Sequence, residues 1–363
     1  MMDFRRRNLI VLGALAAASV ALAGMMLTIR AQEGRARFAP GEFLPGFAAH
    51  VKDATHIHIV SRDGTFDVDY LPAKGSWVLP ARGNYPADFE RVRQTLIGLA
   101  AMETVEPKTA RADWLPLIGL DAPPRGSGVA ITVTDKTDKT LAALIVGNTA
   151  ELENAQGATG LFVRHPGDNQ SYLARAVFGL RGNVADWLET GVMNIDAARI
   201  NSVTIAPING APFTVARPNP SSREYKLEGA TPKGFAANPA MVNLIPQLIT
   251  GFAFVDVQPA IQVDFSKAVH LTAHTFDMQN VRMEAVAVKD AVWVRISAQA
   301  DPGTPTMQRQ EAGIINARAA EWAYKLSPDK GQLLMTTRDA LVTKAQAGGL
   351  EGLPPGMTFG APN

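Results

Sequence analysis

The sequence predicts an α+β protein that begins with a transmembrane helix and continues as two tandem, similar lobes, each an antiparallel sheet with a packed helix. Three observations support this: an uncharged apolar run between Arg7 and Arg30, a strand–turn–helix pattern that occurs twice, and a series of short strands after each copy. The expected organisation is a cytoplasmic stub and anchor over residues 1–30, a linker over 31–52, lobes over 53–190 and 195–346, and a flexible tail over 347–363.

Composition restricts the class of protein. A chain of 363 residues with 47% hydrophobic and 19% charged residues can bury a core in about two domains. Its formal charge is only +1, so we expect no nucleic-acid partner, because phosphate backbones require concentrated Lys and Arg. The absence of cysteine excludes disulfides, thiolate metal sites, a cysteine nucleophile and a lipid-carrying cysteine.

The first 30 residues favour a membrane anchor. The uncharged run from residue 8 to residue 29 is about 22 residues long, and about 20 apolar residues cross a bilayer core. A cleaved signal peptide is the alternative, because Ala21-Leu22-Ala23 resembles a small-x-small cleavage site, but the apolar run continues beyond it. The arginines at positions 5–7 directly precede the run. We therefore expect a cytoplasmic N-terminus and a single-pass protein of the bacterial inner membrane, with the bulk of the chain periplasmic.

Small residues recur on nearly one side of this predicted helix, at Gly13, Ala17, Ala21 and Gly24. Such residues let a neighbouring transmembrane helix approach closely. The sequence leaves two interpretations open: a specific contact with a partner helix, or an alanine-rich tether without a preferred face.

The first copy of the repeated pattern covers residues 76–107. Trp77-Val78-Leu79 is predicted to end a strand, and Pro86 to occupy an early helical position, with Asp88 and Glu90 near the positive end of the helix dipole. The predicted apolar stripe of the helix is Phe89, Val92, Leu96 and Leu99.

The second copy covers residues 224–259. Tyr225-Lys226-Leu227 occupies the place of the first strand, and Asn238-Pro239 is typical of an N-cap and first helical position. Pro246 is expected to kink or split this helix. The predicted apolar stripe is Val242, Ile245, Leu248, Ile249 and Phe252. The two copies end in similar segments, Val105-Glu106-Pro107 and Val257-Gln258-Pro259.

Short strands complete each predicted lobe. Asp63-Gly64 and Asn209-Gly210 predict hairpins, and meander strands are expected at 129–134, 141–146, 160–164, 269–276, 281–288 and 291–295. Each half is expected to close on a helical segment with a tryptophan, Ala185-Asp186-Trp187 and Ala320-Glu321-Trp322, and a further helix is expected from Pro328 to Gln346. The best short match between the halves is Leu161-Phe-Val-Arg164 with Val292-Trp-Val-Arg295; the common order of elements indicates an internal duplication.

His56 and His58 are the strongest candidates for chemistry. On a strand their imidazoles point to one face, about 7 Å apart, which suits a metal ion. Asp67 and Asp69 follow nearby, and His270 and His274 are distant. Because no third ligand stands at a diagnostic spacing, we expect no metal and no cofactor, with both histidines facing solvent and Ile57 and Ile59 buried.

Other motifs do not indicate a reaction. Gly126-Ser127-Gly128 is not a G-x-S-x-G motif, the glycines near 157–160 form neither a dinucleotide fingerprint nor a P-loop, and Glu151 and Glu153 are typical of a solvated loop. The tryptophans Trp77, Trp187, Trp293 and Trp322 are interpreted as core anchors, with a ligand-stacking set as the alternative. No catalytic residue is assigned.

Four segments, in order along the chain, resemble a bacterial family known only as a domain of unknown function: Trp77-Val-Leu-Pro80, Tyr85-Pro-Ala-Asp88, Leu117-Ile-Gly-Leu-Asp121 and Val146-Gly147. The family pattern has tyrosine where this chain has Ile118, and its proline is found here at Pro123. The resemblance covers residues 53–260. It implies an N-terminally anchored periplasmic protein, often encoded beside gliding-motility-type ABC transporter subunits, and it transfers no catalytic residue.

The expected function is therefore a non-enzymatic accessory or scaffold subunit of an ABC-type transport or envelope-assembly complex, with protein partners and a membrane anchor. Two alternatives stay open. One is a periplasmic hydrolase that uses His56 and His58, and the other is a module that binds cell-wall glycan through exposed aromatic residues.

Overall fold

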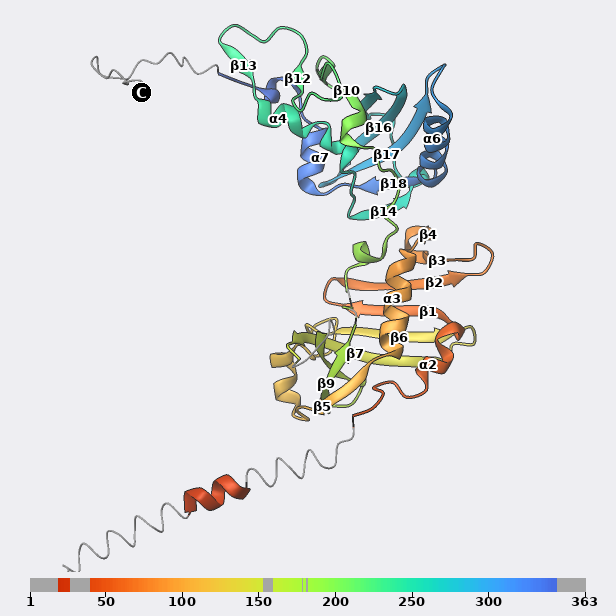
Figure 1. Cartoon of the computed structure of the whole chain (residues 1–363), viewed down its shortest axis with the longest axis vertical. Coiled ribbons are helices and arrows are strands. Elements are labelled where there is room, and N and C mark those ends of the chain that lie inside the picture. Colours follow the sequence, from red (N-terminus) through yellow and green to blue (C-terminus); the bar gives the residue numbers. More distant parts are fainter. Residues whose placement is uncertain (1–18, 27–39, 153–158, 178, 181, 345–363) are drawn as a thin grey trace, which may run out of the picture. The chain divides into compact units, whose positions relative to one another are not determined.

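The chain folds as a mixed α+β protein with antiparallel sheets. The computed structural model describes residues 19–26, 40–152, 159–177, 179–180 and 182–344. It divides into two compact units, unit 1 (Met1–Leu188) and unit 2 (Glu189–Asn363), which are described separately (Figure 1).

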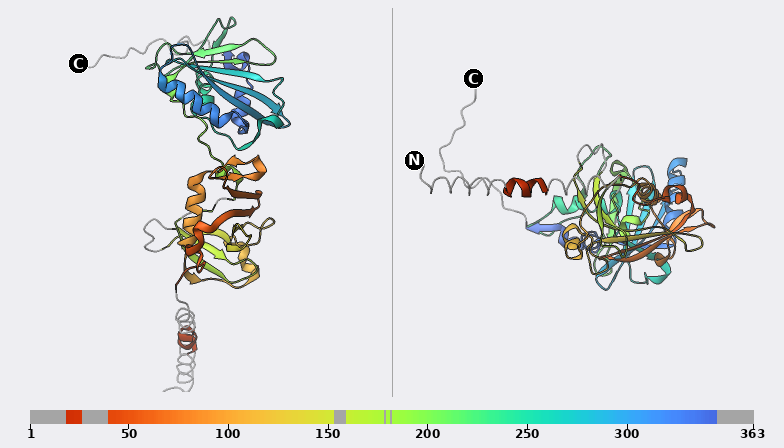
Figure 2. Two further views of the ribbon diagram at one scale, coloured as in Figure 1. Left: turned by 90° about the vertical axis from the view of Figure 1, so that its right-hand side faces the viewer. Right: turned by 90° about the horizontal axis from the view of Figure 1, so that it is seen from below.

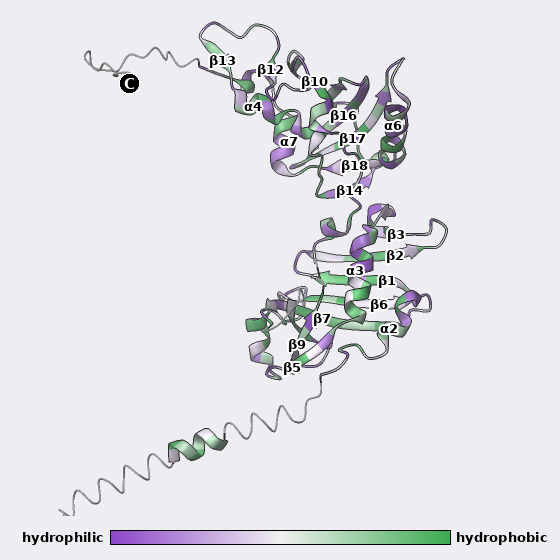
Figure 3. Cartoon of the chain, viewed as in Figure 1, coloured by the Kyte–Doolittle hydropathy of each residue, from purple (hydrophilic) through white to green (hydrophobic). Residues whose placement is uncertain are grey.

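Unit 1 is built on a sheet with the strand order β4-β3-β2-β1-β6-β7-β8-β9-β5, and every described strand pair is antiparallel. The strands are β1 (Ala54–Ser61), β2 (Gly64–Leu71), β3 (Ser76–Leu79), β4 (Tyr85–Pro86), β5 (Glu103–Pro107), β6 (Val129–Asp135), β7 (Thr140–Ala150), β8 (Thr159–Arg164) and β9 (Ser171–Ala176). Ser61 pairs with Gly64, so the β1–β2 hairpin turns through two residues, Arg62 and Asp63. The predicted hairpin is confirmed, with its turn one residue earlier than the predicted Asp63-Gly64. Figure 3 shows hydrophobic residues along the central strands of this sheet.

Helix α3 (Phe89–Ala100) lies along one face of this sheet (Figure 2, left), and the short α2 (Phe47–His50) precedes β1. Asp88 is the N-cap of α3, and its carboxylate oxygen lies 3.1 Å from the main-chain nitrogen of Arg91, which donates a hydrogen bond to it. Two predictions are wrong here. Pro86 is not helical but pairs with Val78 in the sheet. Phe89 is 63% exposed because a helical side chain leans toward the N-terminus, so the first residue reaches past the helix end.

Trp187 anchors the end of unit 1. It closes the 3-10 helix η4 (Val184–Trp187), is fully buried, and packs edge-on against Phe66 with ring centroids 6.1 Å apart. Its carbonyl accepts a 2.9 Å hydrogen bond from the main chain of Asp88. Trp77 and Trp322 are also buried and Trp293 is partly buried, which confirms the structural interpretation of the tryptophans.

Unit 2 is built on a sheet with the strand order β12-β11-β10-β15-β16-β17-β18-β14, again antiparallel in every described pair. The strands are β10 (Ile200–Ala206), β11 (Phe213–Ala216), β12 (Lys226–Leu227), β14 (Asp256–Pro259), β15 (Val269–Thr275), β16 (Gln279–Val288), β17 (Ala291–Ala300) and β18 (Trp322–Lys325). A separate pair joins β13 (Phe235–Ala237) to β19 (Val342–Lys344), and α6 (Thr306–Ala319) packs beside β17.

The second copy of the helix is divided, as Pro246 predicts. Asn238 caps α4 (Pro239–Leu244), and Pro246 precedes α5 (Gln247–Thr250), because proline cannot donate the hydrogen bond that would continue the helix. Phe252 lies beyond the helix and not in its stripe.

Two predicted helices of unit 2 are wrong in part. Trp322 opens strand β18, where it pairs with Pro259, so the segment 320–322 is not helical. The helix expected from Pro328 to Gln346 ends early as α7 (Pro328–Leu334), and η7 (Arg338–Leu341) and β19 follow it. In both places pairing with a distant strand overrides the local helical preference.

Most of the predicted anchor, including Gly13 and Ala17, lies outside the described residues, as does the predicted tail. Residues 19–26 form an exposed helix. Within the residues that the structure describes, no helix has the length and apolar character needed to cross a membrane.

Candidate functional site

A short segment after β5 covers the outer face of the unit 1 sheet. Leu115 of the 3-10 helix η3 (Ala112–Ile118) and Leu120 pack on Ile145 of β7, and all three are buried. Ile145 points away from its neighbours Leu144 and Val146, because side chains alternate along a strand. The segment therefore forms a small second core on the opposite face of the sheet.

Close backbone contacts hold this segment in place. A Cβ atom on Gly147 would lie 2.3 Å from the carbonyl oxygen of Ile118, and one on Gly126 would lie 2.4 Å from that of Asp121. Gly119 adopts the left-handed region with φ of 72°, which favours glycine. The segments 117–121 and 146–147 singled out in the sequence are thus one packed unit.

Arg164 of β8 connects the sheet to the turn formed by residues 117–128. Its guanidinium is buried, with Nε donating to the carbonyl of Leu120 at 2.8 Å and Nη1 to that of Asp168 at 3.0 Å. The Ser127 hydroxyl donates to Asp121 at 2.6 Å, and this hydrogen bond lowers the pKa of the Asp121 carboxyl. The turn is consequently fixed by polar contacts as well as by packing.

This frame presents apolar side chains to solvent. Trp114 is 48% exposed and Leu117 is 75% exposed, and both line a hollow of about 410 Å³ together with Lys108, Thr109, Ile118 and Phe162. Arg111 lies 4.7 Å from the centre of the Trp114 ring and is held by Asp113. We call Trp114, Leu117, Ile118 and Phe162 the Trp114 surface. Exposed tryptophan and arginine are the residues that most often carry binding energy in protein interfaces.

His56 and His58 lie on strand β1, and Ile57 and Ile59 are buried on its other face, as predicted. In the hairpin His56 stands opposite Asp69, and His58 stands opposite Asp67. Nδ1 of His58 is 2.6 Å from Asp67, and Nδ1 of His56 contacts Asp69. The structure thus gathers two imidazoles and two carboxylates on one face.

The distant histidines, His270 and His274, lie on β15 in unit 2, facing solvent. Glu151 lies at the end of the described part of its loop, and Glu153 lies outside the described residues. Ser127 contacts a carboxylate and not an imidazole.

The sequence model of the family described as "Domain of unknown function (DUF4340)" matches residues 77–273, more than half of the 363 residues. The chain belongs to the DUF4340 family. The DUF4340 region starts at Trp77 and contains the complete Trp114 surface, whereas His56 and His58 precede it. No curated protein matches the chain significantly, and no solved structure does.

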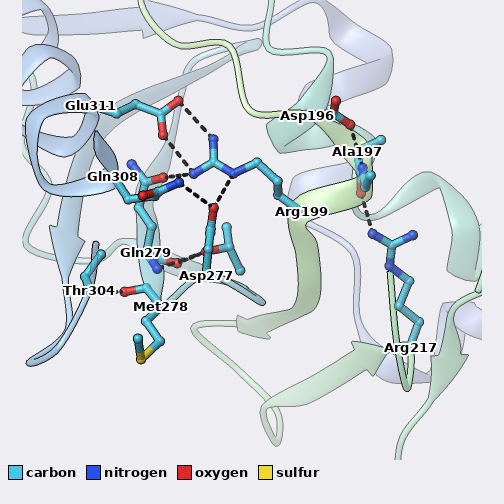
Figure 4. Close-up of polar contacts among 12 residues, drawn as sticks. Asp196, Ala197, Arg199, Arg217, Asp277, Met278, Gln279, Thr304, Gln308 and Glu311 are labelled. Atoms are coloured by element: carbon cyan, nitrogen blue, oxygen red, sulfur yellow. Dashed lines mark hydrogen bonds and ion pairs between the residues drawn. The ribbon is translucent and has the colours of Figure 1, made fainter. Parts of the chain in front are cut away.

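The DUF4340 region also contains the two arginines, Arg199 and Arg217, of a polar cluster in unit 2 (Figure 4). Arg199, at the end of η5 (Ala197–Arg199), contacts Asp277 at 2.7 Å, Gln279 at 2.6 Å and Glu311 at 2.8 Å. Nearby, the buried Arg217 donates to the carbonyls of Ile200 and Ala197. These contacts join the start of β10 to the β15–β16 turn and α6, so the cluster is structural.

Asp277 makes the stability of unit 2 sensitive to acid. Burial raises the pKa of its carboxyl, but hydrogen bonds from Thr275 and Arg199 and the charge of Arg199 lower it more, so the pKa lies below its usual range. A pKa lowered by folding adds stability above the unfolded pKa of about 3.9, and this stability is lost as the pH falls through the folded value.

We expect Asp277→Asn to lower the free energy of unfolding of unit 2 by roughly 1 kcal/mol at neutral pH, the scale of a partly screened charged hydrogen bond. The difference from wild type should shrink below about pH 4. Urea unfolding at neutral and acid pH measures it. Asp290→Asn, at an exposed position in the β16–β17 turn, is the control and should match wild type. A difference that persists unchanged in acid would contradict the role of the charge.

The sequence did not indicate a role for Trp114 or Arg199, and Arg164 stood out only as the end of the repeated segment 161–164. Trp114 carried a signal, because it follows Arg111 and precedes Leu117 in a loop between strands. The contacts of the arginines carried none, since Arg199 and Glu311 are 112 residues apart and Arg164 and Leu120 are 44 apart.

Proposed function

We propose that this protein is a non-enzymatic accessory or scaffold subunit of an ABC-type transport or envelope-assembly complex in the bacterial inner membrane. In this proposal the N-terminal segment is a single-pass anchor, the two units lie in the periplasm, and a protein partner docks on the Trp114 surface. The observation that carries it is a rigid turn that holds two large apolar side chains in solvent, beside an open hollow.

The framework of this surface supports a binding role. The turn is braced by Gly147, Gly126 and the buried Arg164, so docking would cost little conformational entropy. Trp114 is a rigid anchor with a polar rim made by Arg111 and Lys108, which matches the apolar centre and polar edge of protein interfaces. The family resemblance favours a transporter component as the partner.

The proposal includes two tandem, similar lobes that arose by internal duplication. Apart from the edge strand β4, the strand orders of the two sheets correspond position for position. Phe162 of β8 packs on the outer-face core of unit 1, and Trp293 of β17 packs on a cluster around Phe265 in unit 2. The covering segments also expose large apolar residues, Trp114 and Leu117 in unit 1 and Ile261 in unit 2. An experimental structure in which the two sheets did not superpose would contradict the duplication.

Site-specific photo-crosslinking in intact source cells tests the docking surface. A benzophenone amino acid at position 117 should crosslink to one membrane protein, identified by mass spectrometry. The same group at exposed Lys74, in the β2–β3 turn, is the matched control and should not. Adding Trp114→Ala should reduce the crosslink at least roughly tenfold, because interface tryptophans often contribute about 2 kcal/mol or more. Equal crosslinking at both positions would refute the proposal.

Two further experiments distinguish the scaffold from the two alternative functions. The His56→Ala/His58→Ala variant should keep the crosslink and the cellular phenotype if the protein is a scaffold, whereas a hydrolase that uses these residues would lose its function. A glycan-binding module would sediment with purified cell wall, and the Trp114→Ala variant would not.

A further inference from the structure

The face of the β1–β2 hairpin opposite the core carries His56, His58, Asp67 and Asp69, on positions that are paired directly across the two strands. Ligand atoms of His56, His58 and Asp67 all lie within 4.8 Å of one another. Each of the four side chains is between 35% and 41% exposed, so the group is open to solvent but rests on paired strand backbone.

The distances fit a single bound ion. Ligands about 2.0–2.2 Å from a tetrahedral Zn²⁺ are about 3.4 Å from each other. Nε2 of His56 lies 3.5 Å from Oδ1 of Asp67, and the same oxygen is 2.6 Å from Nδ1 of His58. The remaining separation, between the ligand atoms of His56 and His58, is at most 4.8 Å, so the strands hold the three ligands close to the required arrangement.

Asp69 supplies the support that metal-binding histidines require. Its carboxylate accepts a hydrogen bond from Nδ1 of His56, which leaves Nε2 with a free lone pair directed toward Asp67. A carboxylate behind a ligating imidazole fixes the tautomer and the ring orientation. This relation requires two residues from one strand and two from the next, and the hairpin register provides it.

A second observation comes from the neighbouring strand. Thr134 of β6 pairs with His56, and its hydroxyl oxygen is buried without a hydrogen bond in the described structure. Buried polar groups normally have a partner. Thr134 stands directly opposite His56, so its side chain lies on the same face of the sheet as the proposed ligands.

We propose that His56, His58 and Asp67 bind one Zn²⁺ ion, with Asp69 as the residue that positions His56 and a water molecule in the fourth place. Two imidazoles and one carboxylate select a transition ion over Mg²⁺ or Ca²⁺, which prefer oxygen ligands. The sequence lacked a third ligand at a diagnostic spacing, and the hairpin register supplies it in Asp67.

Titration of the metal-free, full-length chain with ZnCl₂, followed by calorimetry, tests this site. We expect one Zn²⁺ per chain, and no comparable binding of MgCl₂. His58→Ala and Asp67→Asn should abolish binding. Asp69→Asn should keep the stoichiometry but weaken the affinity about 10–100-fold, as loss of a supporting carboxylate does.

The matched control is the His270→Ala/His274→Ala variant, which removes two exposed histidines from β15 and should bind Zn²⁺ like wild type. Far-ultraviolet circular dichroism checks that each variant is folded, and Asp67→Asn nearly preserves the shape of the side chain. Co²⁺ in place of Zn²⁺ should give the visible absorption of a low-coordinate site, absent in His58→Ala. Unchanged Zn²⁺ binding in His58→Ala and Asp67→Asn, or no binding by wild type, would overturn the assignment.

Discussion

Replacing Trp187 with alanine is expected to destabilise unit 1 by about 3–5 kcal/mol, the usual cost of removing a large buried aromatic side chain. The indole is fully buried and packs on Phe66 of β2, and the main-chain carbonyl of Trp187 accepts a hydrogen bond from the main chain of Asp88, the N-cap of α3. Its removal leaves a cavity at the junction of the sheet and the helix. Urea unfolding followed by far-ultraviolet circular dichroism measures the loss.

Trp114→Ala is the matched control, because it removes the same side chain from an exposed position. We expect this variant to unfold within about 1 kcal/mol of wild type, as exposed substitutions usually do. Trp187→Phe should fall between the two and stay folded, which keeps the comparison measurable. Equal destabilisation by Trp187→Ala and Trp114→Ala would contradict the assignment of one residue to the core and the other to a binding surface.

Replacing Gly147 with alanine is expected to destabilise unit 1 by about 2–3 kcal/mol, within the range for overpacking at a close contact. The new Cβ would lie 2.3 Å from the carbonyl oxygen of Ile118, and this contact is with main chain that cannot rotate away. The turn that carries the Trp114 surface must therefore shift. The crosslink from position 117 should weaken together with the stability.

Gly313→Ala is the control for this change. Gly313 lies inside α6, and apart from the nearby backbone of its own helix and its two chain neighbours, no atom lies within 4 Å of the position that its Cβ would take. Alanine there should stabilise unit 2 by about 0.5–1 kcal/mol, because glycine loses more backbone entropy in a helix. A neutral Gly147→Ala, in a chain where Gly313→Ala behaves as expected, would show that the turn does not depend on the close contact.

Local features of the sequence predicted much of the fold. Alternation predicts that Ile57 and Ile59 are buried, Asn238-Pro239 predicts the N-cap, and Pro246 predicts the break between two helices, and the structure has all three. These features depend on interactions within a few residues, such as a side chain with the next turn, so the sequence contains all the necessary information. The family segments were also visible, because they are short and continuous.

Element ends were less predictable, since partners far along the chain decide them. Pro86 is extended because it pairs with Val78, and Trp322 is in a strand because it pairs with Pro259. The chain from 342 to 344 forms a strand because β13 lies beside it. In each case hydrogen bonds to a distant strand outweigh a local preference worth only tenths of a kcal/mol per residue.

The sequence by itself determined the α+β class, the hairpins, the buried faces and the pair His56 and His58 as the notable chemical groups. Only the tertiary structure decided what stands opposite them. Register places Asp67 and Asp69 opposite the histidines, and the close packing of Gly147 on Ile118 holds the segment that carries Trp114 against the sheet. The physical reason is that periodicity specifies which face a residue occupies, whereas a site requires particular atoms from separate strands to meet, and pairing and packing across the whole sheet set those distances.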